Sequence, residues 1–232
     1  MTILNSLMMT ASGSGSSCPS IEGTLWTWGK GEDYLGHNAS HTTDVSEPTQ
    51  VGSATDWTNN VGQWGQGVHH VIKENGTLWT WGGNSYGACG MNEGDHSSHK
   101  YSSPVQVGSD TDWAQCSVGW LGGEMSAFVK TDGTLWTCGR NHYGQLGHGD
   151  TTERSSPTQV GSLTDWAMVD VGYRHMYFLK TDGTLWACGW NSYGHLGDGT
   201  ITTRSSPVQI GSATNWIAFE TGTYTGRAIA SV

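Results

Sequence analysis

Ala127-Phe128-Val129-Lys130-Thr131-Asp132-Gly133-Thr134-Leu135-Trp136 contains two short apolar runs joined through an Asp-Gly pair. The runs are rich in β-branched and aromatic residues, which favours strands over helices. An Asp-Gly pair between two such runs is the strongest short-range signal for a β-hairpin, because the turn requires positive φ angles. The segment therefore predicts two antiparallel strands that meet at Asp132-Gly133.

The Gly-Thr-Leu-Trp of this hairpin recurs through the chain as the mark of a tandem repeat. Each copy is followed by Pro-Thr/Val-Gln-Val/Ile-Gly and then by Thr-Asp/Asn-Trp. A unit of about 50 residues with four short strands is typical of one blade of a β-propeller. We therefore expect an all-β fold over residues 21–232, a β-propeller of four repeats. The repeats begin near Gly23, Gly76, Gly133 and Gly183.

A second motif within the units carries a family resemblance. The third unit contains Asn141-His142-Tyr143-Gly144-Gln145-Leu146-Gly147-His148-Gly149-Asp150, and the fourth repeats it closely as Asn191-Ser192-Tyr193-Gly194-His195-Leu196-Gly197-Asp198-Gly199. The second unit keeps the pattern with Cys89 in place of Leu, and the first unit has only a degraded copy at Gly31–Gly36. The motif resembles the repeat of the regulator of chromosome condensation family. The short, Trp-rich, acidic form is similar to the repeats that this family has in bacteriophage genomes.

The resemblance implies a propeller, usually with seven blades formed by one chain, so four units are fewer than the family's pattern. The last residues, 227–232, match the strand that elsewhere precedes the Asp-Gly turn, and Gly23–Trp28 match the strand that follows it. We therefore expect Ile229–Val232 to pair with Leu25–Trp28, since each would cover the other's unpaired edge. Closure within one chain, giving four blades, is the expectation. Closure between two chains, giving eight, is the alternative.

Charge and composition exclude several classes of protein. Only 10 Lys and Arg stand against 20 Asp and Glu, for a formal charge of -10, which disfavours nucleic-acid partners and anionic membrane surfaces. No run of 18 apolar residues exists, so no membrane insertion is expected. Without a recognisable signal peptide, the protein is expected to be made in the cytoplasm.

Motifs for catalysis, cofactors and metals do not emerge from the sequence. There is no phosphate loop and no His-Glu-x-x-His. The pair His96-x-x-His99 lies in a loop insertion and is interpreted as solvated rather than metal-binding. Cys138 and Cys188 occupy positions that are Trp28 and Trp81 in other units, so we interpret them as small core residues. We expect no enzyme activity, no cofactor and no metal.

Ten of the 13 tryptophans lie at repeat-equivalent positions, which indicates a packing role. The other three are candidate surface aromatics that would suit carbohydrate or protein binding. They are Trp64, Trp120 and Trp190.

The N-terminal segment 1–20 differs from the rest of the chain. It is apolar and Met-rich and joins the propeller through the Gly/Ser run Ser12–Ser17, a composition typical of a flexible tether. We expect it to anchor the propeller to a protein partner. The candidate anchor residues are Ile3, Leu4, Leu7, Met8 and Met9.

These features together predict a non-enzymatic structural and interaction protein, displayed on a larger assembly of proteins. The family resemblance makes a bacteriophage virion surface or tail component the concrete expectation, with homo-oligomer formation left open. Two alternatives are a carbohydrate- or protein-binding adhesion module and a regulator that exchanges guanine nucleotides. The exchange role is implied by the best-known member of the resembling family, and no residue here can be matched to it.

Overall fold

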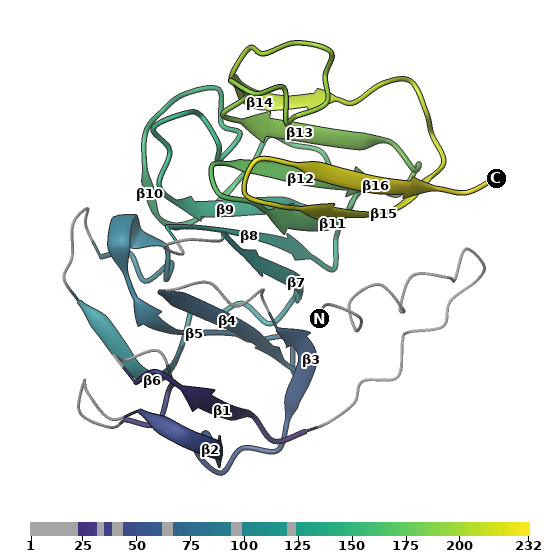
Figure 1. Ribbon diagram of the computed structural model, residues 1–232. Coiled ribbons are helices and arrows are strands. Elements are labelled where there is room, and N and C mark those ends of the chain that lie inside the picture. The colour runs from purple at the N-terminus through teal and green to yellow at the C-terminus, as the bar shows by residue number, and fades with distance from the viewer. Residues whose placement is uncertain (1–22, 32–34, 39–43, 62–66, 94–98, 120–123) are drawn as a thin grey trace.

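The computed structural model describes residues 23–31, 35–38, 44–61, 67–93, 99–119 and 124–232. Three antiparallel sheets of four strands lie between two sheets of two strands (Figure 1). Within each sheet the strands follow one another in chain order, as in the blades of a propeller. The expected all-β, propeller-like architecture is therefore confirmed, and the blades form an open arc whose two ends do not meet (Figure 1).

The three complete blades have the same order of strands. The first consists of β3 (Trp57–Val61), β4 (Val68–Lys73), β5 (Leu78–Gly83) and β6 (Lys100–Gln106), with a short 3-10 helix η2 (Ser85–Gly87) after β5. The second consists of β7 (Trp113–Val118), β8 (Met125–Lys130), β9 (Leu135–Gly139) and β10 (Arg154–Gln159). The third consists of β11 (Trp166–Val171), β12 (His175–Lys180), β13 (Leu185–Gly189) and β14 (Arg204–Gln209).

The two ends of the arc are half blades. At the N-terminal end β1 (Trp26–Gly29) pairs with β2 (Val45–Gln50), which correspond to the third and fourth strands of a blade. At the C-terminal end β15 (Trp216–Thr221) pairs with β16 (Gly226–Ala230), which correspond to the first and second strands. The predicted pairing of Ile229–Val232 with Leu25–Trp28 is not present in this structure, where β1 and β16 lie in separate sheets.

The hairpin expected at Asp132-Gly133 is confirmed. Phe128 on β8 lies opposite Trp136 on β9, and Gly133 adopts a φ of 79° in the turn between them. The Asp132 carboxylate accepts hydrogen bonds from the backbone N–H and the hydroxyl of Thr134, over 2.9 and 2.7 Å. The same arrangement recurs at Asn75 and Asp182, so one local sequence produces one local structure three times.

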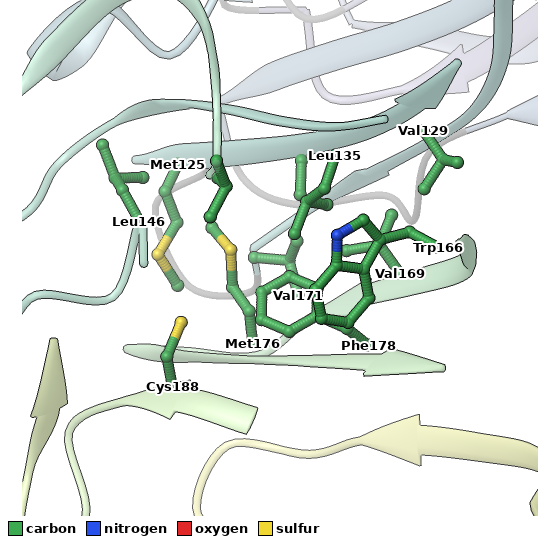
Figure 2. Packing of buried hydrophobic residues seen from close by; sticks show 12 residues of the cluster. Met125, Val129, Leu135, Leu146, Trp166, Val169, Val171, Met176, Phe178 and Cys188 are labelled. Carbon is green, nitrogen blue, oxygen red and sulfur yellow. The ribbon is translucent and has the colours of Figure 1, made fainter. Parts of the chain in front are cut away.

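The first strand of each blade is the innermost one, because these strands contact one another from blade to blade. β7 contacts both β3 and β11, and β11 contacts β15. Apolar side chains fill the space between the second and third complete blades (Figure 2). Met125 and Leu135 from one blade pack with Trp166, Met176 and Phe178 from the next, all nearly inaccessible to solvent. A continuous buried core therefore joins the two blades.

A buried polar network also joins the inner strands. Asp170 on β11 accepts a hydrogen bond from Ser117 Oγ on β7 over 3.1 Å, and it accepts two more from Thr221 on β15. Burial raises the pKa of Asp170 to about 6, although its hydrogen bonds act in the opposite direction. The Val171 N–H donates to Ser117 Oγ over 3.1 Å. Three successive inner strands are thus linked through one carboxylate.

The packing role predicted for the repeated tryptophans is confirmed in the complete blades and is wrong at the N-terminal end. Trp57, Trp81, Trp113 and Trp166 are buried, whereas Trp26 and Trp28 are 45% and 60% exposed. The physical reason is that no described blade precedes β1, whereas the equivalent Trp81 packs against Leu25 and Val51 of the preceding half blade. Cys138 and Cys188 are fully buried, as expected for small core residues. Within the described ranges, no helix is long and apolar enough to cross a membrane.

Candidate functional site

Loops from four separate parts of the chain converge beside the third complete blade. They are the loop after β9, the turn between β11 and β12, the loop after β13 and the turn between β15 and β16. In an antiparallel sheet the end of one strand lies beside the start of the next, so the turn between β11 and β12 and the loop after β13 lie at the same end of the sheet. Seven side chains meet there and are called the aromatic cluster. They are Tyr143, Tyr173, Arg174, Trp190, Tyr193, His195 and Tyr224.

Trp190 is the centre of the aromatic cluster. Its ring centroid lies 5.2 Å from that of Tyr193, 5.8 Å from that of Tyr224 and 6.1 Å from that of Tyr143. The contacts with Tyr193 and Tyr224 are edge-to-face, the geometry that the quadrupoles of aromatic rings favour. Tyr193 and Tyr224 also contact each other at 5.6 Å. The rings therefore support one another and form a preorganised surface.

Arg174 is held among the rings by its guanidinium group. The guanidinium carbon lies 4.6 Å from the Tyr173 ring centroid and 5.0 Å from that of Tyr143. Its terminal nitrogens donate hydrogen bonds to the hydroxyls of Tyr143 and Tyr173, over 3.0 and 2.9 Å. Within the described part of the chain, no carboxylate forms an ion pair with Arg174. The cluster thus presents one positive charge in a chain whose formal charge is -10.

In the first complete blade these positions hold Gly67 and Gly83, and in the second they hold an ion pair. There the residue before β8 is Glu124 and the residue after β9 is Arg140, and these two side chains form an ion pair. The N–H of Arg140 donates to the carbonyl of Glu124, just as the N–H of Trp190 donates to the carbonyl of Arg174. In the third complete blade, Arg174 therefore takes the place of Glu124, and Trp190 takes the place of Arg140. The ion pair is lost, and Arg174 forms no ion pair with a described carboxylate.

Exposure divides the aromatic cluster into a rim and a base. Tyr193 and Tyr224 are 70% and 46% exposed, whereas Trp190 and Arg174 are half-buried. His195 is buried beneath them, and its ring centroid lies 4.7 Å from that of the fully buried His175. The rim, Tyr193 and Tyr224, is accessible to a partner. The base, His195 and His175, lies beneath it and is buried.

The two histidines at the base are neutral at physiological pH. Burial lowers the pKa of His175 to about 3, and the nearby His195 acts in the same direction. Burial also lowers the pKa of His195, against a small opposing effect of the Trp190 backbone, which lies close to the ring without making a hydrogen bond of good geometry. The base is therefore an uncharged platform, and Arg174 provides the charge.

The structure places one of the three predicted surface aromatics, Trp190, at the centre of the aromatic cluster. Trp64 and Trp120 lie outside the described residues. So do the candidate anchor residues, which were Ile3, Leu4, Leu7, Met8 and Met9. Sequence reasoning missed Tyr173, Arg174 and Tyr224. The available signal was that Arg174 and Trp190 take the places of Glu124 and Arg140 in the repeat.

The sequence model of the regulator of chromosome condensation (RCC1) repeat matches residues 75–121, 132–179 and 182–226, which is more than half of the chain. The X-linked retinitis pigmentosa GTPase regulator homolog of Caenorhabditis elegans is 38% identical over 101 residues, covering 42% of this chain and 7% of that protein. The ultraviolet-B receptor UVR8 of Arabidopsis thaliana is 29% identical over 172 residues, covering 72% of this chain and 37% of that protein. The chain thus spans well under two thirds of the length of these relatives.

Among solved structures, the fold is similar to that of human WBSCR16. The TM-score is 0.76 at 20% sequence identity, and the match covers 91% of this chain and 54% of that chain. At this identity the likeness concerns the fold alone. The arc of blades therefore follows the course of about half of a longer propeller chain.

Proposed function

Because the chain belongs to the regulator of chromosome condensation (RCC1) repeat family, we propose that it is a non-enzymatic interaction protein whose aromatic cluster binds a protein partner. The observation that carries the proposal is the exposed rim of Tyr193 and Tyr224 above half-buried Trp190 and Arg174. Tyr, Trp and Arg are the residue types enriched in binding hot spots, because they offer large contact areas from few or preorganised rotamers.

Arg174 favours a protein partner that has a carboxylate at the contact. Its guanidinium already donates to the hydroxyls of Tyr143 and Tyr173, which orient it, and no described carboxylate neutralises it. A charge-assisted hydrogen bond to a carboxylate is stronger than one between neutral groups. The overall charge of -10 repels strongly acidic partners at long range, so the partner's carboxylate is expected within a neutral or basic surface.

A library of random peptides displayed on yeast tests this binding function. Peptides selected on the wild-type protein should contain Asp or Glu beside apolar residues. Their affinity should fall at least about tenfold for Arg174→Gln and for the double variant Tyr193→Ser/Tyr224→Ser, since hot-spot truncations have effects of this size. Ile201→Ser, at an exposed apolar residue in the loop after β13, is the control and should leave binding unchanged. Selected peptides that bind the three variants equally well would contradict the proposal.

Carbohydrate binding is the second candidate, because sugar rings also stack on exposed aromatic side chains such as Tyr193. A glycan array separates the two candidates. If the wild-type protein binds glycans on the array, the double variant Tyr193→Ser/Tyr224→Ser does not, and no peptide is selected, then the ligand is a glycan and not a protein.

We propose further that the propeller is displayed on a larger assembly and anchored by residues 1–20. The bacteriophage virion is the concrete form of this proposal, and its support is the short, Trp-rich, acidic form of the repeat. The relatives described above come from an animal and a plant and lend it no weight. Deleting residues 1–20 should abolish incorporation of the propeller into its assembly while leaving the propeller folded. Incorporation at wild-type occupancy would contradict it.

Guanine-nucleotide exchange is the third candidate and rests on family membership alone. Nucleotide release from a panel of small GTPases would test it. If the wild-type protein accelerates nucleotide release and its Arg174→Gln variant does not, then the aromatic cluster takes part in nucleotide exchange.

We propose that the free edge of β16 pairs with the free edge of β1 and completes a four-stranded blade. The support is that the two half blades contain complementary strands.

A further inference from the structure

The two ends of the arc expose apolar side chains that are buried everywhere else in the repeat. Trp28 on β1 is 60% exposed, whereas its counterparts Trp81, Cys138 and Cys188 are buried. Ile229 on β16 is 58% exposed, whereas its counterpart Leu179 is buried. The counterpart Trp81 packs against Leu25 and Val51 of the preceding half blade, so Trp28 is exposed because no described blade precedes β1. Exposed apolar faces and unpaired strand edges are sites for association with another chain.

We propose that two copies of this chain close a ring, in which β16 of each copy pairs with β1 of the other copy. Each junction then contains β15 and β16 from one chain and β1 and β2 from its partner, in the order of a complete blade. Two identical junctions related by a two-fold axis pair the β16 edge of each copy with the β1 edge of the other, so the ring closes with two copies. This inference rests on the proposed pairing of β16 with β1 and adds which chain supplies each strand.

The complete blades define the register of the junction. In the third complete blade, Leu179 lies opposite Leu185 and Phe178 lies opposite Trp186. The pairing of β15 with β16 places Ile229 at the position of Leu179 and Ala228 at that of Phe178. The repeat places Leu25 and Trp26 at the positions of Leu185 and Trp186. The junction therefore pairs Leu25 with Ile229 and Trp26 with Ala228.

A contact between tryptophans supports the same junction. In each complete blade, the first Trp of the inner strand meets the Trp of Gly-Thr-Leu-Trp edge-to-face. The centroid distances are 5.9 Å for Trp57–Trp79, 5.9 Å for Trp113–Trp136 and 6.1 Å for Trp166–Trp186. In the half blades Trp216 and Trp26 hold these two positions, and neither has such a contact with the described residues. Each half blade thus supplies one member of the missing pair.

The curvature of the arc indicates that the matching strand comes from a second copy. A ring of four blades requires a rotation of roughly 90° between neighbours, whereas a ring of eight requires roughly 45°. The arc superposes on 54% of the human WBSCR16 chain at a TM-score of 0.76, so it has the gentle curvature of about half of a longer propeller. Two such arcs close a ring with little change in the angle between blades.

Closure within one chain would require the interfaces between blades to break. The buried cluster of Met125, Trp166 and Phe178 and the Ser117–Asp170–Thr221 network fix the angle between successive blades. Dense interiors resist continuous bending, because small changes of angle open voids or create clashes.

Native mass spectrometry and sedimentation of the full chain provide the first test. The expected mass is twice the chain mass of 24.9 kDa. Ile229→Asp should convert the dimer to a monomer, because it places a charge within the apolar junction. Ile201→Asp, at another exposed isoleucine away from both edges, should remain a dimer. A wild-type protein that is monomeric at micromolar concentration overturns the inference.

Disulfide cross-linking provides the second test and identifies the chains. All variants carry Cys18→Ser, so that the four remaining cysteines are the buried ones. One chain carries Trp26→Cys and the other Ala228→Cys, and neither can form this disulfide alone. After mixing and oxidation, a disulfide-linked dimer is expected. If only a chain with both substitutions forms the bond, and forms it within itself, then β16 pairs with β1 of the same chain, and the inference of a second copy is wrong. If no bond forms in either experiment, the pairing itself is wrong.

Discussion

Asp170 on β11 accepts two hydrogen bonds from Thr221 on β15, one from the backbone N–H over 2.7 Å and one from the side-chain hydroxyl over 2.8 Å. Together with Ser117 on β7, the pair links the inner strands of three successive blades. The carboxylate is buried, so its charge is less well solvated than in the unfolded chain. This one residue therefore links three blades and makes the stability of their arrangement sensitive to pH.

Asp170→Asn should change how stability depends on pH. Because burial raises the pKa of Asp170 to about 6, the folded wild-type protein binds a proton that the unfolded chain has lost, and its stability falls as the pH rises towards 6. The amide does not titrate. The free energy of unfolding of the variant, measured relative to wild type, should increase by up to about 3 kcal/mol between about pH 4 and pH 7. A constant difference across this range in urea titrations would contradict the prediction.

His175→Phe should remove an opposite dependence. Burial lowers the pKa of His175 to about 3, so the unfolded chain binds a proton below its ordinary pKa of 6.5 while the folded protein does not. The wild-type protein therefore loses stability as the pH falls below 6.5, by about 2 kcal/mol down to about pH 5 from this residue alone. Chemical denaturation at the two pH values should show a smaller loss in His175→Phe. His142→Phe, at an exposed histidine, is the control and should keep the wild-type loss.

Gly133→Ala should destabilise the second complete blade. Gly133 has a φ of 79°, and a Cβ atom there would lie 2.1 Å from the carbonyl oxygen of Thr164. The expected loss is at least about 2 kcal/mol, from the left-handed conformation and the clash together. Gly161 has a φ of 61° and open space around its Cα, so Gly161→Ala should cost only about 1 kcal/mol. Equal melting temperatures of the two variants would show that the clash is relieved by movement.

The four described cysteines should not react with thiol reagents in the folded protein. All four are buried, and burial raises the pKa of Cys89 to about 12 and also raises the pKa values of Cys138 and Cys188. The reactive thiolate is therefore scarce and inaccessible. In a Cys18→Ser protein, a colorimetric disulfide reagent should release no rapid signal until denaturant is added. A rapid signal without denaturant would show that one of these sites opens.

Ala230→Lys combined with Asn215→Asp should strengthen the junction between two chains. In the complete blades a lysine lies over two tryptophan rings and pairs with an aspartate, as Lys180 does with Trp166, Trp186 and Asp165. Ala230 and Asn215 hold these positions in the half blade. The dissociation constant of the dimer, measured by sedimentation, should fall about five- to thirtyfold. This fall corresponds to about 1–2 kcal/mol of cation–π and ionic interaction. Ala230→Gln with Asn215→Asp is the control without the cation.

The repeat motifs alone were sufficient to predict the strands of the blades, but not the open arc that the blades form. Asp132-Gly133 and its equivalents predict a hairpin, because turn geometry and alternating apolar residues act over a few neighbouring positions. Since each unit repeats the same local pattern, the four strands of a complete blade and the burial of Cys138 could be predicted from one sequence. The role of Trp190 as a candidate surface aromatic could also be predicted, because no tryptophan holds its position in the other units.

Contacts between distant segments were decided by the tertiary structure. Tyr143, Arg174 and Tyr224 come from different loops, and only the packing of successive blades brings them to one surface. Trp28 and Trp81 are equivalent in sequence, yet one is exposed and the other buried. Local sequence sets which strand forms, whereas burial depends on whether a neighbouring blade covers the face of its sheet, as the first half blade covers Trp81.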